Sequence, residues 1–324
     1  HAAVEFLERE HEEPFLLVVS LMNPHNICEW ARRGAGREQN LSCGEIGTPP
    51  EADDLLPPVP FNLDPPTNEP DGMTLIRCAY QVPDGKFPVA EFTPHDWRKQ
   101  RWGYYRMVEK VDGEIAKVLD ALNEAGVDEN TLVIFTSDHG DCTGAHQFNQ
   151  KTVLYDESIR IPLIVRWKGK TPTVTSGALV NTGVDILPTM LDVAGIDQPE
   201  ALPGRSVLPL ALGKEEESRL EYIVGQNHLA QTGIVDGFRP SMHGRMVRTD
   251  RFKYCLYQYG ERRESLYDMD NDPGETVNLA GDLAYRDVVL HHRELLAEFG
   301  VAHNDALAAE MLANEVGPKP FPED

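Results

Sequence analysis

The chain has 324 residues, of which 41% are hydrophobic, and carries a formal net charge of −23. This length is sufficient for a large α/β core with a smaller unit appended to it. The acidic charge argues against nucleic acid, anionic membranes or long sulfated polysaccharides as partners of the general surface, because such partners need a basic footprint. A local basic pocket is compatible with this net negative charge. No apolar run approaches the length of a membrane span, and five cysteines without a C-x-x-C pair indicate neither a zinc site nor a disulfide framework.

The N-terminal part predicts a helix, a strand and a candidate catalytic histidine. Residues 1–10 have the apolar pattern of a helix and lead, without a signal-like segment, into residues 15–21, which predict a buried strand. His25 follows this strand, and in open α/β sheets ligands collect at the carboxyl ends of strands. A neutral imidazole there can accept a proton, and a charged one can donate it. A loop histidine without a chemical role is the alternative.

Residues 29–98 predict the least regular structure. Eight prolines between Thr48 and Asp71 exclude regular helix and central strand. Loops this long are commonly functional, so we expect a wall of the ligand cleft, with a solvated loop as the alternative. From Tyr104 to Ala125 apolar residues recur at three- and four-residue steps, which predicts an amphipathic helix that covers the sheet and ends at Gly126.

The stretch from Thr131 to Arg166 combines two apolar runs with a dense polar segment between them. The runs 132–135 and 161–165 predict strands buried on both faces. Asp138 would supply a hard anionic oxygen, His139 a nitrogen for a metal or an oxyanion, and Lys151 a positive charge. Together they suit a ligand with several negative oxygens, such as a sulfate or phosphate ester. The alternative is that Asp138 caps the next turn and Lys151 is solvated.

The last part of the chain predicts a smaller unit. Residues 184–194 indicate a helix, and the charged run 214–218 indicates a linker. Three short runs punctuated by glycine and charged turns predict an antiparallel sheet, at 222–225, 244–249 and 252–257. Residues 285–299 predict a final helix. We therefore expect an α/β core over residues 1–213 and a C-terminal subdomain over residues 214–324.

The motifs of the central stretch resemble those of the sulfatase family within the alkaline-phosphatase-like superfamily. The resemblance rests on TSDHGD followed by GAHQFNQKTVLYDESIRIPLIVR, on the helix start WGYYRMVEK, and on LYDMDNDPGETVNLA. It covers most of the chain. It implies an α/β fold with an alkaline-phosphatase-like, mostly parallel sheet flanked by helices, and a small C-terminal antiparallel α+β subdomain.

The resemblance also implies roles for individual residues. In the family, the Asp and the adjacent His of the motif help to bind a calcium ion, which assigns Asp138 and His139 to the metal, with magnesium as the alternative ion. The Lys holds the sulfate, which assigns Lys151. A His in the place of His25 contacts the sulfate or the leaving-group oxygen.

Two further histidines are candidate substrate-binding residues. His146 lies on the loop between Asp138 and Lys151. His243 belongs to the C-terminal subdomain, which in the family folds over the cleft and helps to select the substrate. For each, a structural role is the alternative.

The family's nucleophile is a formylglycine, formed from the Cys or Ser of a C/S-x-P/A-x-R motif. No cysteine or serine of this sequence fits: Cys28 comes closest, with Arg32 four residues on, but Trp30 occupies the position of Pro or Ala. We therefore expect the chain to begin within a domain. Formylglycine and an Asp pair for the metal would come from an upstream segment, and the chain by itself would be inactive.

These implications make a sulfuric ester hydrolase acting on a sulfated small molecule or saccharide the expected function. A phosphoester or phosphonate-ester hydrolase of the same superfamily is one alternative, which a Thr or Ser nucleophile outside the oxidation motif would favour. A nonenzymatic binding fragment or pseudoenzyme is the other. No nucleic acid partner and no membrane span are expected, the resemblance suggests a periplasmic or secreted location, and the oligomeric state stays open.

Overall fold

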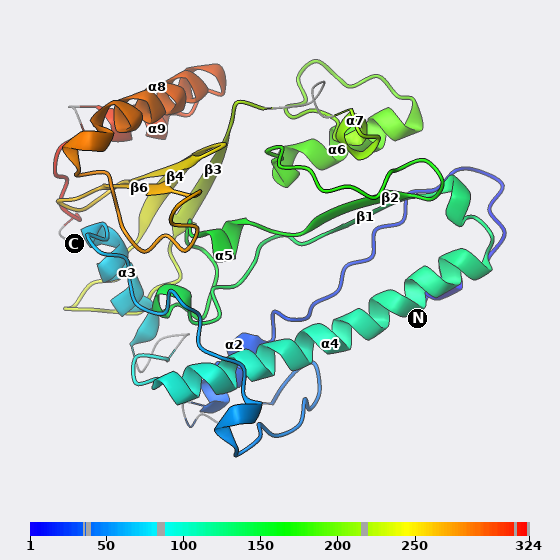
Figure 1. Cartoon of the computed structure of the whole chain (residues 1–324), viewed down its shortest axis with the longest axis horizontal. Helices are drawn as coiled ribbons and strands as arrows, with labels where there is room; N and C mark the ends of the chain where they lie inside the picture. The colour runs from blue at the N-terminus through cyan, green and yellow to red at the C-terminus, as the bar shows by residue number, and fades with distance from the viewer. Residues whose placement is uncertain (35, 37–39, 83–87, 215–219, 314–315, 323–324) are drawn as a thin grey trace.

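Two antiparallel sheets organise the described structure, one in the middle of the chain and one in its C-terminal part (Figure 1). The computed structural model describes residues 1–324 except 35, 37–39, 83–87, 215–219, 314–315 and 323–324. The smaller sheet pairs β1 (Leu132–Thr136) with β2 (Leu163–Trp167). No helix among these described residues is long and apolar enough to cross a membrane.

The two central strands are confirmed, but their pairing and burial differ from the prediction. β1 and β2 run antiparallel, with Thr136 opposite Leu163, so the described strands do not form the expected mostly parallel sheet. A parallel pair needs a crossover connection, whereas residues 137–162 bring the chain back beside the end of β1. Phe135 and Ile164 are 38% and 59% exposed, so the pair is not buried on both faces.

The strand predicted over residues 15–21 is wrong. No described strand pairs with these residues, which run as an irregular segment in Figure 1. Leu16 and Val18 are largely exposed, because a segment outside any ladder has no sheet face against which to align its apolar side chains. Helix α1 is also shorter than predicted, at Ala2–Leu7.

Residues 29–98 contain more regular structure than predicted. They include most of α2 (Ile27–Gly34), the short 3-10 helix η1 (Asp53–Leu55) and α3 (Asp71–Gln81). The long helix α4 spans Pro94–Glu124 and so begins well before Tyr104. Thr93 and Asp96 form a capping box, and proline in the first turn fits the start of a helix, which explains the earlier boundary.

Short helices connect these elements to the C-terminal part. They are η2 (Asp128–Asn130), η3 (Ala145–Gln147), α5 (Asp156–Ile159), α6 (Thr182–Ala194) and α7 (Leu208–Ala211). The larger sheet follows in the order β3 (Tyr222–Leu229), β4 (Met242–Thr249), β5 (Phe252–Tyr257) and β6 (Glu264–Asp268). After η5 (Leu283–Tyr285), helices α8 (Arg286–Ala302) and α9 (Ala306–Leu312) pack on this sheet (Figure 1). The three predicted strands correspond to β3, which is longer than expected, β4 and β5, and the predicted final helix corresponds to α8. Strand β6 and helix α9 were not predicted.

One hydrophobic core joins the two parts of the chain. It includes Cys142 and Leu154 beside the central motif, and Met242 and Tyr257 from the larger sheet. The predicted boundary between residues 213 and 214 adjoins residues 215–219, which lie outside the described residues, and the division into 1–213 and 214–324 stays a prediction. The shared core means that the sheet is packed directly behind the candidate site.

Candidate active site

Lys151 and His25 meet although they are distant in the sequence. His25 lies in the turn before α2, where its amide donates to the carbonyl of Met22. Lys151 Nζ lies 2.9 Å from His25 Nδ1, so the ammonium donates to the ring nitrogen. The neutral ring then carries its proton on Nε2. His25 is an exposed residue, which leaves this second nitrogen accessible to a ligand.

The Lys151 side chain is buried without an acidic partner. The residue is 8% exposed, and among the described residues no carboxylate lies within 4.0 Å of its ammonium. Asp141 interacts with Lys151 only at longer range, and a buried charge without a direct ion-pair partner is costly in free energy. The position therefore favours an anion beside Lys151.

Asp138 and His139 come directly after β1, as predicted. Asp138 Oδ1 accepts from the amide of His139, and its Oδ2 lies 3.3 Å from His139 Nε2. His139 Nδ1 donates to the carbonyl of Gly140 at 2.9 Å, so in the neutral ring Nε2 keeps a free lone pair. The Asp138 side chain is 83% exposed. An accessible carboxylate and an unprotonated nitrogen side by side fit as two ligands of one cation.

The four residues also form one electrostatic group. Partial burial lowers the pKa of His25 below its ordinary value, Lys151 and His139 lower it further, and Asp138 opposes them. The imidazole is therefore neutral at neutral pH, consistent with accepting a hydrogen bond from Lys151. Proximity in space thus unites all the predicted catalytic and metal residues.

Asp141 is a site residue that the prediction did not include. Burial raises the pKa of Asp141 to about 7. The hydrogen bond from the amide of Thr143 and the charge of Lys151 both lower this pKa, but by less than burial raises it. The residue as a whole is partly exposed. It directly precedes Cys142, which is fully buried in the shared core. Asp141 could have been noticed in the sequence as the second Asp of DHGD, but only the tertiary structure shows that its carboxyl group is buried.

His146 does not line an accessible pocket. Its residue exposure is 0%, and its ring stacks on Tyr155 with 3.9 Å between centroids. His146 Nε2 lies 3.3 Å from Asn62 Nδ2, and burial lowers the pKa of His146 to about 3. The structure therefore gives this histidine a packing position and no support for the expected contact with substrate.

His243 lies on β4 and stacks on His228 of β3, with ring centroids 4.1 Å apart. His228 Nε2 is in turn 2.9 Å from Ser241 Oγ. Within the described part of the chain we find no contact between His243 and His25 or Lys151. A substrate-binding role for His243 stays a prediction.

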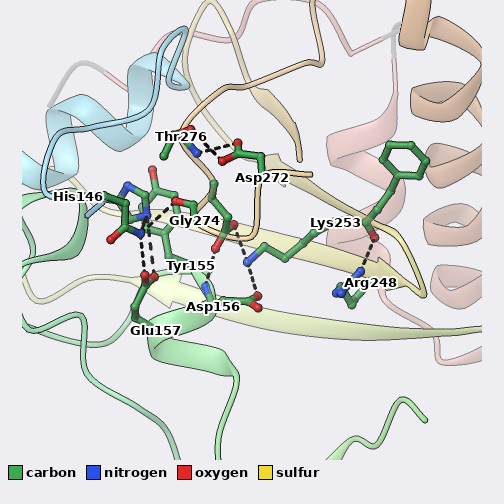
Figure 2. Close-up of polar contacts among 12 residues, drawn as sticks. His146, Tyr155, Asp156, Glu157, Arg248, Lys253, Asp272, Gly274 and Thr276 are labelled. Carbon is green, nitrogen blue, oxygen red and sulfur yellow. Dashed lines mark hydrogen bonds and ion pairs between the residues drawn. The ribbon is translucent and has the colours of Figure 1, made fainter. Parts of the chain in front are cut away.

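A second cluster contains metal-ligating residue types. His146, Glu157 and Glu275 offer ligand atoms within 4.8 Å of one another. However, Asn62 Nδ2 donates to Glu157 Oε1 at 2.7 Å, and Lys253 Nζ lies 2.5 Å from Glu275 Oε1 (Figure 2 labels Lys253 and Glu157). Protein donors contact one oxygen of Glu157 and both oxygens of Glu275, while Glu157 Oε2 has no hydrogen-bond partner among the described residues. The Asp138–His139 pair is accessible to solvent, which makes it the better metal candidate.

Cys28 does not have the environment of a nucleophile. It lies within α2, is 9% exposed, and belongs to the shared hydrophobic core. Burial raises the pKa of its thiol, which disfavours the reactive thiolate. This agrees with its misfit to the formylglycine motif.

Family models match most of the sequence. The model described as Sulfatase matches residues 1–196, and the model described as N-sulphoglucosamine sulphohydrolase, C-terminal, matches residues 144–301. The Delta 4,5-hexuronate-2-O-sulfatase of Bacteroides thetaiotaomicron is 31% identical over 304 residues, which cover 92% of this chain and 59% of that protein. The chain thus spans about three fifths of the length of this relative.

Solved structures share the fold. That of a 2-O GAG sulfatase matches with a TM-score of 0.80 at 27% identity, covering 95% of this chain and 63% of that chain. A structure in complex with its substrate D-glucosamine-2-N,6-O-disulfate matches with a TM-score of 0.54 at 27% identity, covering 65% of this chain and 42% of that chain. The alkaline-phosphatase-like α/β fold is therefore confirmed. Since its model matches more than half of the 324 residues, the chain belongs to the sulfatase family.

Proposed function

We propose that the enzyme containing this chain hydrolyses a sulfate monoester. The observation that carries this proposal is the buried, carboxylate-free ammonium of Lys151 beside His25. An ester sulfate is an anion with several oxygens, and fixed cations in a water-poor site stabilise such groups strongly. The neighbouring Asp138–His139 pair makes the site suitable for an anion held jointly by a metal and a lysine.

The chain's own residues have separable roles. Lys151 binds a sulfate oxygen and stabilises the negative charge that develops on it. Its hydrogen bond also orients the His25 ring, so that Nε2 faces outward. His25 then gives the proton on Nε2 to the oxygen of the departing alcohol while its Nδ1 takes a proton from the Lys151 ammonium, so the ring stays neutral.

Asp138 and His139 would hold a divalent cation, and we propose calcium, with magnesium as the alternative. When bound, such an ion supplies positive charge to the sulfate oxygens. Calcium prefers six to eight oxygen ligands, so Asp138 is expected to bind it more strongly than the imidazole of His139. Further oxygen ligands are required.

The nucleophile is proposed to be a formylglycine outside these 324 residues. None of their cysteines or serines stands in the oxidation motif. The proposed activity is therefore that of an enzyme in which this chain is joined to a segment carrying that residue.

We further propose a sulfated saccharide of short length as the substrate. Support comes from the hexuronate-2-O-sulfatase relative and the 2-O GAG sulfatase structure. The net charge of −23 favours a short saccharide over a long sulfated chain, which the general surface would repel. A periplasmic or secreted location would suit such a substrate.

The test compares the hydrolysis of three sulfate esters, followed as released sulfate, with that of one matched analogue, followed as released phenol. The esters are an unsaturated hexuronate 2-O-sulfate disaccharide, a sulfated glucosamine and an aryl sulfate, and the analogue is an aryl phosphonate ester. We expect the highest kcat/KM for a sulfated saccharide, measured by ion chromatography, and its loss in Lys151→Ala. Faster phosphonate hydrolysis would favour the phosphonate-ester alternative. Saccharide binding without turnover, with the formylglycine confirmed by mass spectrometry, would favour the nonenzymatic one.

A further inference from the structure

The segment 151–158 connects the candidate site to the larger sheet. It begins at Lys151 and ends within α5, and residues 153, 154 and 155 in its middle are each at most 2% exposed. One end therefore carries the proposed sulfate ligand, while the other end lies among charged residues of the C-terminal part. The question is what holds this segment in place.

An ion pair from the C-terminal part binds the far end of the segment. Lys253 Nζ on β5 lies 2.5 Å from Glu275 Oε1 and 2.8 Å from Asp156 Oδ1. Glu275 Oε2 accepts from the amide of Asp156 at 2.6 Å. Figure 2 shows Lys253 reaching from the sheet toward Asp156. The Lys253 and Glu275 side chains are 0% and 1% exposed, so water does not compete for these contacts.

The charges of Lys253 and Asp156 reinforce this geometry. Burial alone would lower the pKa of Lys253, yet Glu275 and Asp156 raise it well above its ordinary value. Burial alone would likewise raise the pKa of Asp156, but Lys253 holds it below its usual range. For Glu275, burial and Asp156 raise the pKa to about 7 although Lys253 lowers it. Removing Lys253 would therefore leave buried carboxyl groups without their positive partner.

Apolar packing and a glycine contact complete the arrangement. A Cβ added to Gly244 of β4 would lie 2.9 Å from Leu154 Cδ1, so the sheet closely approaches the segment. On the other side, the amide of Gly140 donates to the carbonyl of Ser158 at 2.8 Å. The segment thus lies between the C-terminal sheet and the loop that carries Asp138 and His139.

We propose that Lys253 and Glu275 are positioning residues for Lys151, through which the C-terminal sheet holds the proposed sulfate ligand in place. The expected effect on catalysis rests on the proposed function, whereas the expected effect on the position of segment 151–158 does not. Glu275 acts through the backbone amide of Asp156 and Lys253 through its side chain, and neither residue touches substrate or metal. The same contacts reach the His146–Glu157–Glu275 cluster, where Asn62 donates to Glu157 Oε1 and Lys253 pairs with Glu275 Oε1.

The structural test measures amide hydrogen exchange in the full chain. Lys253→Met combined with Glu275→Gln removes both charges of the fully buried pair, and the glutamine oxygen can still accept from the amide of Asp156. Asp156 loses its contact with Lys253, but its side chain is 17% exposed and reaches water. Arg293→Met with Glu264→Gln is the matched control, because this pair joins α8 to β6 and has side chains 24% and 14% exposed. We expect faster exchange over residues 151–160 in the first variant only. Unchanged protection there would overturn the proposal.

The functional test uses the complete enzyme at a temperature where circular dichroism shows both double variants to be folded. A displacement of about 1 Å at a catalytic group can lower the rate by roughly 10²-fold. We therefore expect kcat/KM of the Lys253/Glu275 variant to decrease by a factor of about 10 to 10². The inhibition constant of inorganic sulfate should rise with it. An equal loss in both variants at equal thermal midpoints would show a general stability effect and refute positioning.

The two proposals fail in different ways. If the parent enzyme released no sulfate from any ester, the proposed function would fall, while the exchange comparison would still decide whether the pair holds the segment. If the parent were active and the exchange protection of residues 151–160 did not change, only the positioning proposal would fall.

Discussion

Lys151 Nζ lies 2.9 Å from His25 Nδ1, across 126 residues of sequence. This contact joins a buried cation to an exposed imidazole and fixes which ring nitrogen is free to act on a ligand. The two residues are proposed to act differently on the ester: Lys151 stabilises negative charge on the sulfate, and His25 gives a proton to the leaving oxygen. The first two predictions use this difference in the complete enzyme.

Lys151→Ala should lower the hydrolysis rate for every sulfate ester to a similar degree. Loss of one preorganised electrostatic contact typically costs about 10²- to 10³-fold in rate. Lys168→Ala is the control, since the Lys168 side chain is 43% exposed and its partner Asp128 keeps a second ion pair with Arg166. Steady-state kinetics of both variants check the prediction, and near-parental activity of Lys151→Ala would contradict the assignment.

His25→Ala should slow esters of poorly acidic alcohols far more than esters of activated phenols, because a good leaving group needs little proton assistance. The measurement is kcat/KM across phenyl sulfates of graded leaving-group pKa. His291→Ala, at an exposed position of α8, serves as the control. A His25 variant whose dependence on leaving-group pKa is no steeper than that of the parent would exclude the general-acid role.

Asp138→Asn should weaken metal binding and lower the rate together, because it removes the charged oxygen from the proposed metal site. Metal content by mass spectrometry and calcium titration measure the first effect, and kinetics at saturating calcium measure the second. Asp192→Asn changes an exposed carboxylate on α6 and should alter neither. Normal metal content in the Asp138 variant would count against the site.

Gly140→Ala should disrupt the contact between α5 and the loop that carries Asp138 and His139. A Cβ there would lie 2.0 Å from the carbonyl oxygen of Glu157, so the backbone must shift. We expect a lower thermal midpoint and lower activity. Gly113→Ala is the control: a Cβ at that position on α4 meets nothing within 4 Å, and alanine favours helix by up to about 1 kcal/mol. Equal thermal midpoints for the two variants would show that the close approach is unimportant.

The buried His146 should make the protein less stable in acid. Burial lowers its folded pKa from 6.5 to about 3, so the unfolded chain binds the proton more readily. Its contribution to stability is complete above about pH 6.5 and is lost as the pH falls toward 3, by up to about 1.4 kcal/mol per pH unit. His146→Gln should remove this part of the pH dependence, as measured by urea denaturation between pH 5 and 8. An unchanged slope would mean that another group is responsible.

The sequence by itself determined the chemistry of the central motif and most local elements. β1, α6 and the strands of the larger sheet follow from short apolar periods, and the switch from apolar to polar residues after Phe135 located Asp138 and His139. Such patterns are local, so they do not state which strand pairs with which. The run 15–21 has the composition of a strand but no described partner, and β1 and β2 pair antiparallel although a mostly parallel sheet was expected.

Only the tertiary structure decided how the site is assembled. The burial of Lys151, its contact with His25 and the hold of Lys253 and Glu275 on Asp156 all join residues far apart in the chain. The same packing moved His146 into the interior, although its place on the motif loop suggested a ligand contact. Single-sequence periodicity carries no information about such distant pairs, because a side chain's burial and partners depend on which elements the completed core brings against it.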